Sequence, residues 1–126
     1  MPHTMLLISI VDDDVSVCRA LRRLVQSAGY TVETFASARA FLDSSSTGRT
    51  ACLVLDIHMD GMSGFELSEQ LAQDRTAIPI IFITAHDDAL TRERVRRAGV
   101  AAYLPKPFDE QALLAAIARA VNGGPR

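Results

Sequence analysis

The fold is decided by the stretch that runs from Leu6 to Asp14 and reads LLISIVDDD. Its first six residues are apolar apart from Ser9, which is the pattern of a β-strand buried on both faces of a sheet. Three aspartates follow at once, so a buried strand ends directly in acidic side chains. Three further apolar runs also stop close to a polar or charged residue: Ala51–Leu55 before Asp56, Ile80–Ile83 before Thr84, and Ala101–Leu104 before Lys106.

Helical patterns separate these apolar runs. Strands are expected at Leu6–Val11, Thr31–Phe35, Ala51–Leu55, Ile80–Ile83 and Ala101–Leu104, and helices at Val15–Ala28, Ala38–Asp43, Gly64–Ala72, Asp87–Arg97 and Asp109–Val121, with a polar loop at Ser44–Thr50. Five strands that alternate with five helices predict an α/β fold with a doubly wound, five-stranded parallel sheet. The fourth helix has few apolar residues, chiefly Leu90 and Val95, so we expect it to be the least firmly packed.

The polar residues at the strand ends are expected to form one site. In an open parallel sheet the carboxyl ends of the strands line one edge, which is where ligands bind. Asp12, Asp13 and Asp56 would bring three negative charges to that edge, together with the hydroxyl of Thr84 and the ammonium of Lys106. One Mg²⁺ and the lysine would balance the three carboxylates, and such a site could hold a phosphoryl group.

The same motifs carry a family resemblance. The segments Val11–Asp14, Leu55–Met59, Ile83–Ala85 and Lys106–Phe108 resemble those of the receiver domain of bacterial two-component response regulators. This is the CheY-like superfamily, and the chain is most similar to its FixJ-type members, from about Leu6 to Val121. The resemblance implies the strand order 2-1-3-4-5, which is also that of flavodoxin.

The resemblance also implies a chemical role for each strand-end residue. Asp56 would accept a phosphoryl group from a sensor histidine kinase, with Asp12 and Asp13 holding Mg²⁺ beside it. The backbone carbonyl of His58 would be a further metal ligand. Lys106 would pair with the phosphoryl oxygens, and its bond to the following proline is cis in the family.

Two residues would report the phosphorylation. The hydroxyl of Thr84 would bind the phosphoryl group, and the aromatic ring of Tyr103 would rotate inward as the threonine moves. The surface formed by the fourth helix, the fifth strand and the fifth helix would change as a result, and regulate an output domain or a partner. Such a domain assists its own phosphotransfer and autodephosphorylation, but it is not an enzyme with a free substrate.

Each of these residues also has a simpler interpretation. The aspartates after the first strand can cap a helix, a role that one residue, Asp14, would fill. Thr84 can be an ordinary strand residue, Lys106 a surface lysine and Tyr103 part of the core. Asp60 departs from the family, which commonly has proline there, and its role stays open, as do those of the side chains of His58 and His86.

Two other functions share this fold. A phosphatase of the haloacid dehalogenase type also uses an aspartate at a strand end, but it needs a second aspartate two residues later, where this chain has His58. A flavodoxin-like electron carrier would need a first loop rich in hydroxyls and amides, whereas this loop consists of Asp12, Asp13 and Asp14. The site therefore favours the receiver function, which the fold alone could not decide.

Composition restricts the setting of this function. The 126 residues are expected to form a single receiver domain, residues 1–126, and the net charge of −2 does not suggest a nucleic-acid surface. Met1–Met5 is too short for a signal peptide and no apolar run is long enough for a membrane span, so we expect a cytoplasmic protein. The expected partners are a sensor histidine kinase and, after phosphorylation, a second copy of the chain; the cognate kinase, the output and the phosphoryl lifetime stay open.

Overall fold

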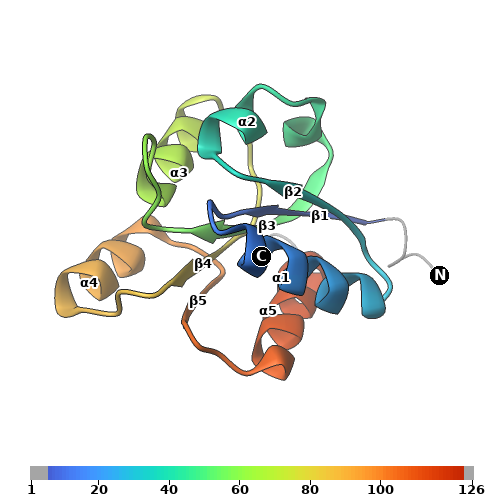
Figure 1. The fold of residues 1–126 in the computed structure, drawn as a ribbon. Coiled ribbons are helices and arrows are strands. Elements are labelled where there is room, and N and C mark those ends of the chain that lie inside the picture. Colours follow the sequence, from blue (N-terminus) through green and yellow to red (C-terminus); the bar gives the residue numbers. More distant parts are fainter. Residues whose placement is uncertain (1–5, 124–126) are drawn as a thin grey trace.

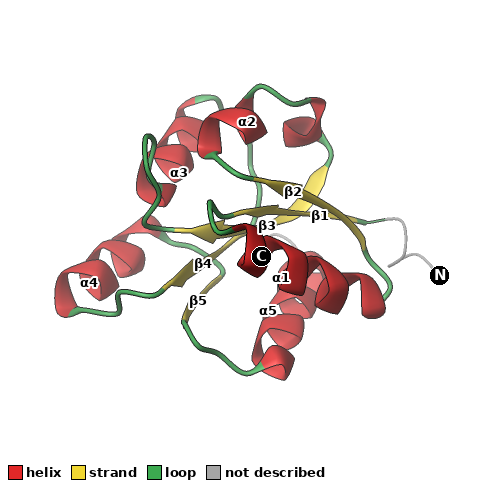
Figure 2. Ribbon diagram, viewed as in Figure 1, coloured by secondary structure: helices red, strands yellow, loops and turns green. Residues whose placement is uncertain are grey.

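The computed structural model describes residues 6–123; the segment Met1–Met5 and residues 124–126 lie outside the described residues. Strands and helices alternate along the chain (Figures 1 and 2), in the order β1 (Leu7–Val11), α1 (Val15–Ser27), β2 (Thr31–Phe35), α2 (Ala38–Leu42), the 3₁₀ helix η2 (Ser45–Gly48), β3 (Thr50–Asp56), α3 (Gly64–Gln73), β4 (Ile80–Thr84), α4 (Ala89–Ala98), β5 (Ala102–Pro105) and α5 (Glu110–Gly123).

The sheet has five parallel strands in the order β2-β1-β3-β4-β5, which confirms the predicted fold class and strand order. Its register aligns the strand ends. Val11 of β1 is paired with Leu55 of β3, so the next residues along these strands, Asp12 and Asp56, come to the same edge. Asp56 is in turn paired with Ile83, the residue before Thr84.

Helices cover both faces of the sheet, with α1 and α5 on one face and α2, α3 and α4 on the other (Figure 1). Successive strand residues point to opposite faces. In β3, Cys52 and Val54 pack with α1 and α5, while Leu53 and Leu55 pack with α2, α3 and α4. The sheet is therefore covered on both faces, as the continuous apolar runs of its strands predict.

Two local features differ from the sequence-based expectation. The segment expected to be a polar loop contains η2, whose first turn is capped by the side chain of Ser44, which accepts a hydrogen bond from the backbone N–H of Ser46. The fourth helix begins at Ala89 rather than Asp87, because Asp88 is its N-cap and accepts a hydrogen bond from the N–H of Thr91.

The fourth helix is only lightly anchored. Thr91 and Val95 are its buried residues. Leu90, which was expected to belong to its apolar face, is instead 80% exposed. Two of the 10 residues of α4 are thus buried, and that this helix is the least firmly packed of the five stays a prediction. Among residues 6–123, no helix combines the length and apolar character needed to cross a membrane.

Gly64 allows α3 to begin directly beside the end of β3. A Cβ atom at this position would lie 2.5 Å from the backbone oxygen of Asp56 and 2.9 Å from the Cα of Ile57. The N–H of Gly64 donates to the carbonyl of Ile57 at 2.8 Å, which fixes the approach. Only glycine fits here without moving the backbone that carries Asp56.

We therefore predict that Gly64→Ala lowers the free energy of unfolding by about 2 kcal/mol, because the added methyl group must push backbone atoms rather than a flexible side chain. Urea unfolding measures this change. The matched control is Gly48→Ala, since a Cβ atom at Gly48 meets nothing within 4 Å. Equal stabilities of the two variants would contradict the close approach.

Candidate functional site

The structure brings three of the predicted carboxylates together. One oxygen each of Asp12, Asp13 and Asp56 lies within 4.8 Å of the others. Asp12 and Asp56 are buried, whereas Asp13 is exposed at the rim. Two buried carboxylates and one exposed carboxylate thus form an acidic cluster at the carboxyl edge of the sheet, as the order of the strand ends predicts.

The three consecutive aspartates after β1 have separate structural roles. Asp14 is the N-cap of α1, and its Oδ1 accepts from the backbone N–H groups of Ser16 and Val17 at 2.9 and 3.3 Å. This confirms that one aspartate is enough for capping. Asp12 accepts a hydrogen bond at 2.9 Å from the N–H of Asp14, which orients its carboxylate toward the site.

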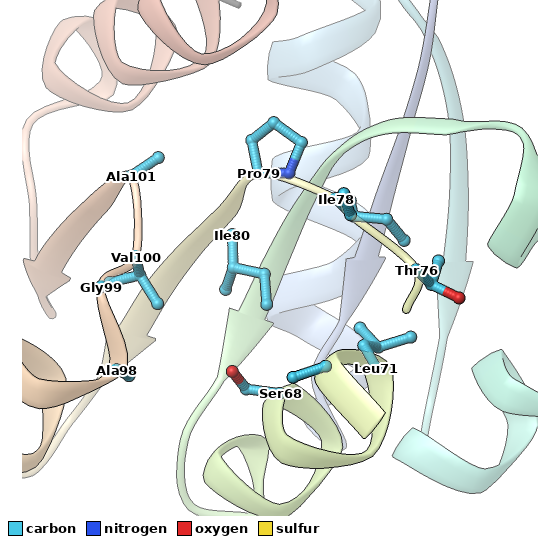
Figure 3. A pocket seen from close by; sticks show the side chains of 12 residues that line it. Ser68, Leu71, Thr76, Ile78, Pro79, Ile80, Ala98, Gly99, Val100 and Ala101 are labelled. Atoms are coloured by element: carbon cyan, nitrogen blue, oxygen red, sulfur yellow. The ribbon is translucent and has the colours of Figure 1, made fainter. Parts of the chain in front are cut away.

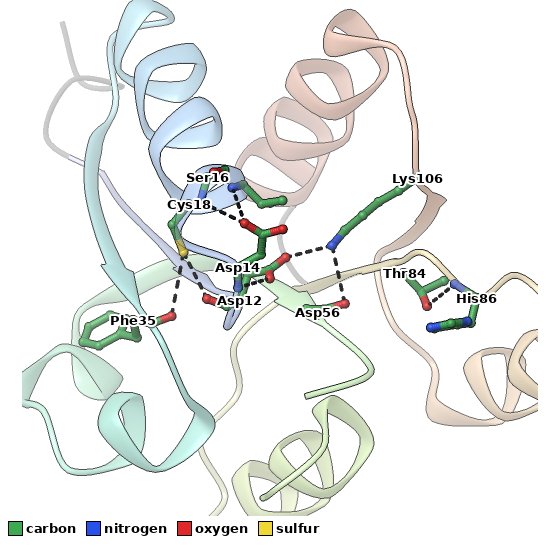
Figure 4. Close-up of polar contacts among 10 residues, drawn as sticks. Asp12, Asp14, Ser16, Cys18, Phe35, Asp56, Thr84, His86 and Lys106 are labelled. Carbon is green, nitrogen blue, oxygen red and sulfur yellow. Dashed lines mark hydrogen bonds and ion pairs between the residues drawn. The ribbon is translucent and has the colours of Figure 1, made fainter. Parts of the chain in front are cut away.

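Lys106 supplies the positive charge of the site. Its Nζ lies 2.9 Å from Oδ2 of Asp12 and 3.8 Å from Oδ1 of Asp56 (Figure 4). The backbone N–H of Lys106 donates to the carbonyl of Thr84 at 2.7 Å, and the peptide bond between Lys106 and Pro107 is cis, as the resemblance implies. A lysine that follows β5 therefore reaches back across the sheet edge to the ends of β1 and β3.

The single ammonium of Lys106 does not balance the charge of the three carboxylates. Burial and the charge of Asp12 raise the pKa of the Asp56 carboxyl from 3.8 to about 6, although Lys106 acts in the opposite direction. Burial also lowers the pKa of Lys106, but the hydrogen bond to Asp12 and the charge of Asp56 outweigh it, and the net shift of the Lys106 pKa is upward. The site therefore favours any group that adds positive charge near Asp56.

Thr84 ends β4 as a buried residue at the same edge. Its hydroxyl oxygen accepts a hydrogen bond at 3.0 Å from the backbone N–H of His86. Its own hydroxyl proton is not committed by this bond and can be donated to another group at the edge. His58, two residues beyond Asp56, carries its imidazole on the exposed rim, where it contacts that of His86.

Tyr103 is half-buried and packs against the core cluster on the side of α2, α3 and α4, while its hydroxyl is held by residues at the start of α4. Its hydroxyl donates to Oδ1 of Asp87 at 2.7 Å, and Nη1 of Arg92 donates to the same oxygen at 3.0 Å. Burial and the bond to Asp87 raise the pKa of Tyr103 to about 12. The sequence did not reveal that Asp87 and Arg92 hold the predicted switch residue. Asp87 lies in the loop before α4 and Arg92 in α4, whereas Tyr103 lies in β5.

Sequence reasoning also missed a contact of Cys18. This cysteine is buried and free. Its thiol also donates to the backbone oxygen of Asp12 at 3.2 Å and so helps to hold the loop after β1 (Figure 4).

One signal in the sequence was overlooked: Lys106 is the only lysine of the chain, while the other basic residues apart from histidine are arginines.

A hollow of about 380 Å³ lies at the opposite edge of the sheet (Figure 3). Pro79 and Ile80 line it where β4 begins, and Gly99 and Ala101 line it just before β5 begins. This hollow contains none of the strand-end carboxylates. The acidic cluster and Lys106 therefore lie away from this hollow, on the carboxyl edge of the sheet.

We predict that Lys106→Met lowers the free energy of unfolding by about 3 kcal/mol at pH 7, because it leaves buried carboxylates without their cation. Removing the lysine charge also raises the pKa of Asp56 further. In the folded variant Asp56 then takes up a proton at a higher pH than in the unfolded chain, so stability is lost as pH rises through that pKa and regained as pH falls. Because the pKa of Asp56 in the parent is about 6, the deficit of the variant should shrink as pH falls from the higher pKa of the variant to about pH 6, and stay level below it.

Urea unfolding of parent and variant across this pH range measures the deficit. Arg39→Met is the matched control, because the ion pair of Arg39 with Asp43 spans 3.7 Å between side chains that are 64% and 68% exposed. Such exposed pairs contribute little to stability. A deficit for Lys106→Met that stayed constant with pH would show that the lysine acts by packing and not by charge.

Comparisons with known proteins identify the family of this chain. A protein-family model described as the response regulator receiver domain matches residues 8–118. Nodulation protein W of Bradyrhizobium diazoefficiens is 41% identical over 119 residues, which are 94% of this chain and 52% of that protein. The response regulator protein TodT of Pseudomonas putida has the same identity and coverage. The chain thus spans about half the length of these curated relatives.

A solved structure has the same architecture over nearly the whole chain. The structure of FixJ-N superposes with a TM-score of 0.86 at 33% identity and covers 97% of this chain and 98% of that one. The predicted similarity to FixJ-type receivers is confirmed. With its acidic cluster, its strand order and its matched relatives, the chain belongs to the response regulator receiver domain family.

Proposed function

We propose that Asp56 is the phosphoacceptor of this receiver domain, and that residues 1–126 form one such domain. The observation that carries this proposal is the position of Lys106, whose ammonium faces Asp12 and Asp56 at the edge where the three carboxylates meet. Asp56 is buried at the end of β3, and a single oxygen of its carboxylate lies near the lysine. The carboxylate of Asp56 would be the group that receives the phosphoryl group.

The transfer would be a direct displacement at phosphorus. A carboxylate oxygen of Asp56 attacks the phosphoryl group of a phosphohistidine; the new O–P bond forms as the N–P bond breaks, and the imidazole leaves with the bonding pair and takes up a proton. Lys106 would move from its carboxylate partners to the phosphoryl oxygens. The hydroxyl of Thr84 would donate to another of these oxygens, because it ends the neighbouring strand.

The acidic cluster fits Mg²⁺, which the receiver family typically uses. Carboxylate oxygens are the ligands that Mg²⁺ prefers, and those of Asp12, Asp13 and Asp56 are close enough to share one ion. The backbone carbonyl of His58 would complete the protein ligands. When bound, Mg²⁺ supplies positive charge that offsets the negative charge of the carboxylates and of the phosphoryl oxygens.

The contact of Tyr103 suggests how phosphorylation would be reported. If Thr84 moves toward the phosphoryl group, space opens beside it and Tyr103 can turn inward only by leaving Asp87. The bond between Tyr103 and Asp87 would then hold the unphosphorylated form. Because α4 is lightly anchored, the surface of α4, β5 and α5 would change first. Phosphorylation adds charge at Asp56 and would shift the equilibrium between two conformations of this surface.

This surface would regulate an output domain or a partner, including a second copy of the chain after phosphorylation. The phosphoryl donor would be a sensor histidine kinase in the cytoplasm. The domain would assist its own phosphotransfer and later lose the phosphoryl group to water, without acting on a free substrate. No role in binding nucleic acid or membrane is proposed for these residues, since the net charge of the chain is −2.

Incubation with acetyl phosphate and Mg²⁺, followed by intact mass spectrometry, tests the proposal. We expect a gain of one phosphoryl group, about 80 Da, that requires Mg²⁺ and is absent from Asp56→Asn. Asp60→Asn is the matched control and should still be labelled, because Asp60 touches the cluster only through its backbone N–H, 3.4 Å from Asp13. Full labelling of Asp56→Asn would place the phosphoacceptor elsewhere.

A further inference from the structure

Two imidazoles meet above the carboxyl edge of the sheet. His58 follows the end of β3 by two residues and His86 follows the end of β4 by two residues, so neighbouring strands place them side by side. Their ring centroids are 5.0 Å apart and their planes are at 87°. Both residues are exposed. Figure 4 shows His86 just beyond Thr84, on the rim of the site.

The ring nitrogens of both histidines are free to bind a ligand. Within residues 6–123, neither imidazole exchanges a hydrogen bond through its nitrogens; the bond that His86 makes to Thr84 uses its backbone N–H. A neutral imidazole has one nitrogen with an available lone pair. Two such nitrogens in one exposed place form the start of a coordination site.

A carboxylate also lies close to this pair in the sequence: Asp88 is two residues beyond His86. The pKa of Asp88 is lowered by hydrogen bonds from Thr91, and in part by the charge of His58. Only Oδ1 of Asp88 accepts from the N–H of Thr91, at 2.8 Å. The carboxylate of Asp88 also interacts electrostatically with His58, which favours a cation over an anion here.

We propose that His58 and His86 together bind one borderline divalent metal ion of the Zn²⁺ type. Imidazole nitrogen suits Zn²⁺, Ni²⁺ and Cu²⁺, whereas carboxylate and carbonyl oxygens suit Mg²⁺. Two imidazoles that share a tetrahedral Zn²⁺, with Zn–N distances of about 2.0–2.1 Å, have ring centres about 5 Å apart. The observed separation of 5.0 Å matches this value. Both side chains are exposed, so the rings have room to adjust their orientation around an ion.

This site differs from the acidic cluster in its ligands and does not depend on phosphorylation of Asp56. The competing explanation is an ordinary edge-to-face contact between two aromatic rings, which fits the same distance. The two explanations differ in what happens when a metal is added. A contact between rings has no affinity for Zn²⁺, whereas a chelating pair loses most of its affinity when either ring is removed.

Calorimetric titration of the untagged protein with Zn²⁺, in excess Mg²⁺ to occupy the acidic cluster, tests the proposal. We expect one Zn²⁺ per chain, and binding weakened on the order of tenfold or more in His58→Ala and in His86→Ala, because each ring raises the effective concentration of the other. His3→Ala, which removes the remaining histidine of the sequence, is the matched control and should bind like the parent protein.

A second control separates this site from the carboxylates. Asp13→Asn weakens the acidic cluster but leaves both imidazoles in place, so Zn²⁺ affinity should persist. Zn²⁺ binding that survives both histidine substitutions would overturn the proposal. Binding that is lost in Asp13→Asn would also overturn it, since the ion would then sit among the carboxylates.

Discussion

The rest of the site depends on the ion pair between Lys106 and Asp12, because a buried carboxylate needs a cation beside it. This 2.9 Å contact pairs a charge from the end of β5 with a buried carboxylate at the end of β1, across the width of β3 and β4. Burying two carboxylates is costly unless a cation accompanies them. A lysine suits this place better than the arginines used elsewhere in the chain, because a compact ammonium on a flexible stem can move from one oxygen to another.

The same constraint leaves an excess of negative charge at the site. One ammonium faces two buried carboxylates and a third at the rim, so the carboxyl of Asp56 is held in an environment that resists its charge. A divalent cation would relieve this excess, and in the proposed function Lys106 and Thr84 would then bind the oxygens of the phosphoryl group. The close packing of Gly64 against the backbone of Asp56 keeps the carboxylate at the sheet edge, where these groups can reach it.

Much of this arrangement was predictable from the sequence, because strand ends in a parallel sheet must share an edge. Buried runs that end at Asp12, Asp56 and Thr84 therefore indicated a parallel sheet and the residues at its carboxyl edge, whereas the strand order was implied by the resemblance to receiver domains. Contacts set by loops and side chains were not predictable in this way. The turn η2 depends on serine caps within a polar stretch, and the exposure of Leu90 depends on where α4 begins. The bond from Tyr103 to Asp87 joins residues 16 positions apart. It depends on the path of the loop that carries Asp87 before α4, and this loop has no periodic signal in the sequence.

The central claim is that Asp56 is a buried carboxylate whose charge is undercompensated until a cation binds. The most direct measurement is an NMR titration of the Asp56 carboxyl carbon, assigned with Asp56→Asn, in protein freed of divalent metal and again with Mg²⁺. We expect the carboxyl to titrate with a pKa of about 6 in the metal-free protein and at clearly lower pH with Mg²⁺. A pKa near the ordinary aspartate value of 3.8 without metal, or a pKa that Mg²⁺ leaves unchanged, would contradict the account.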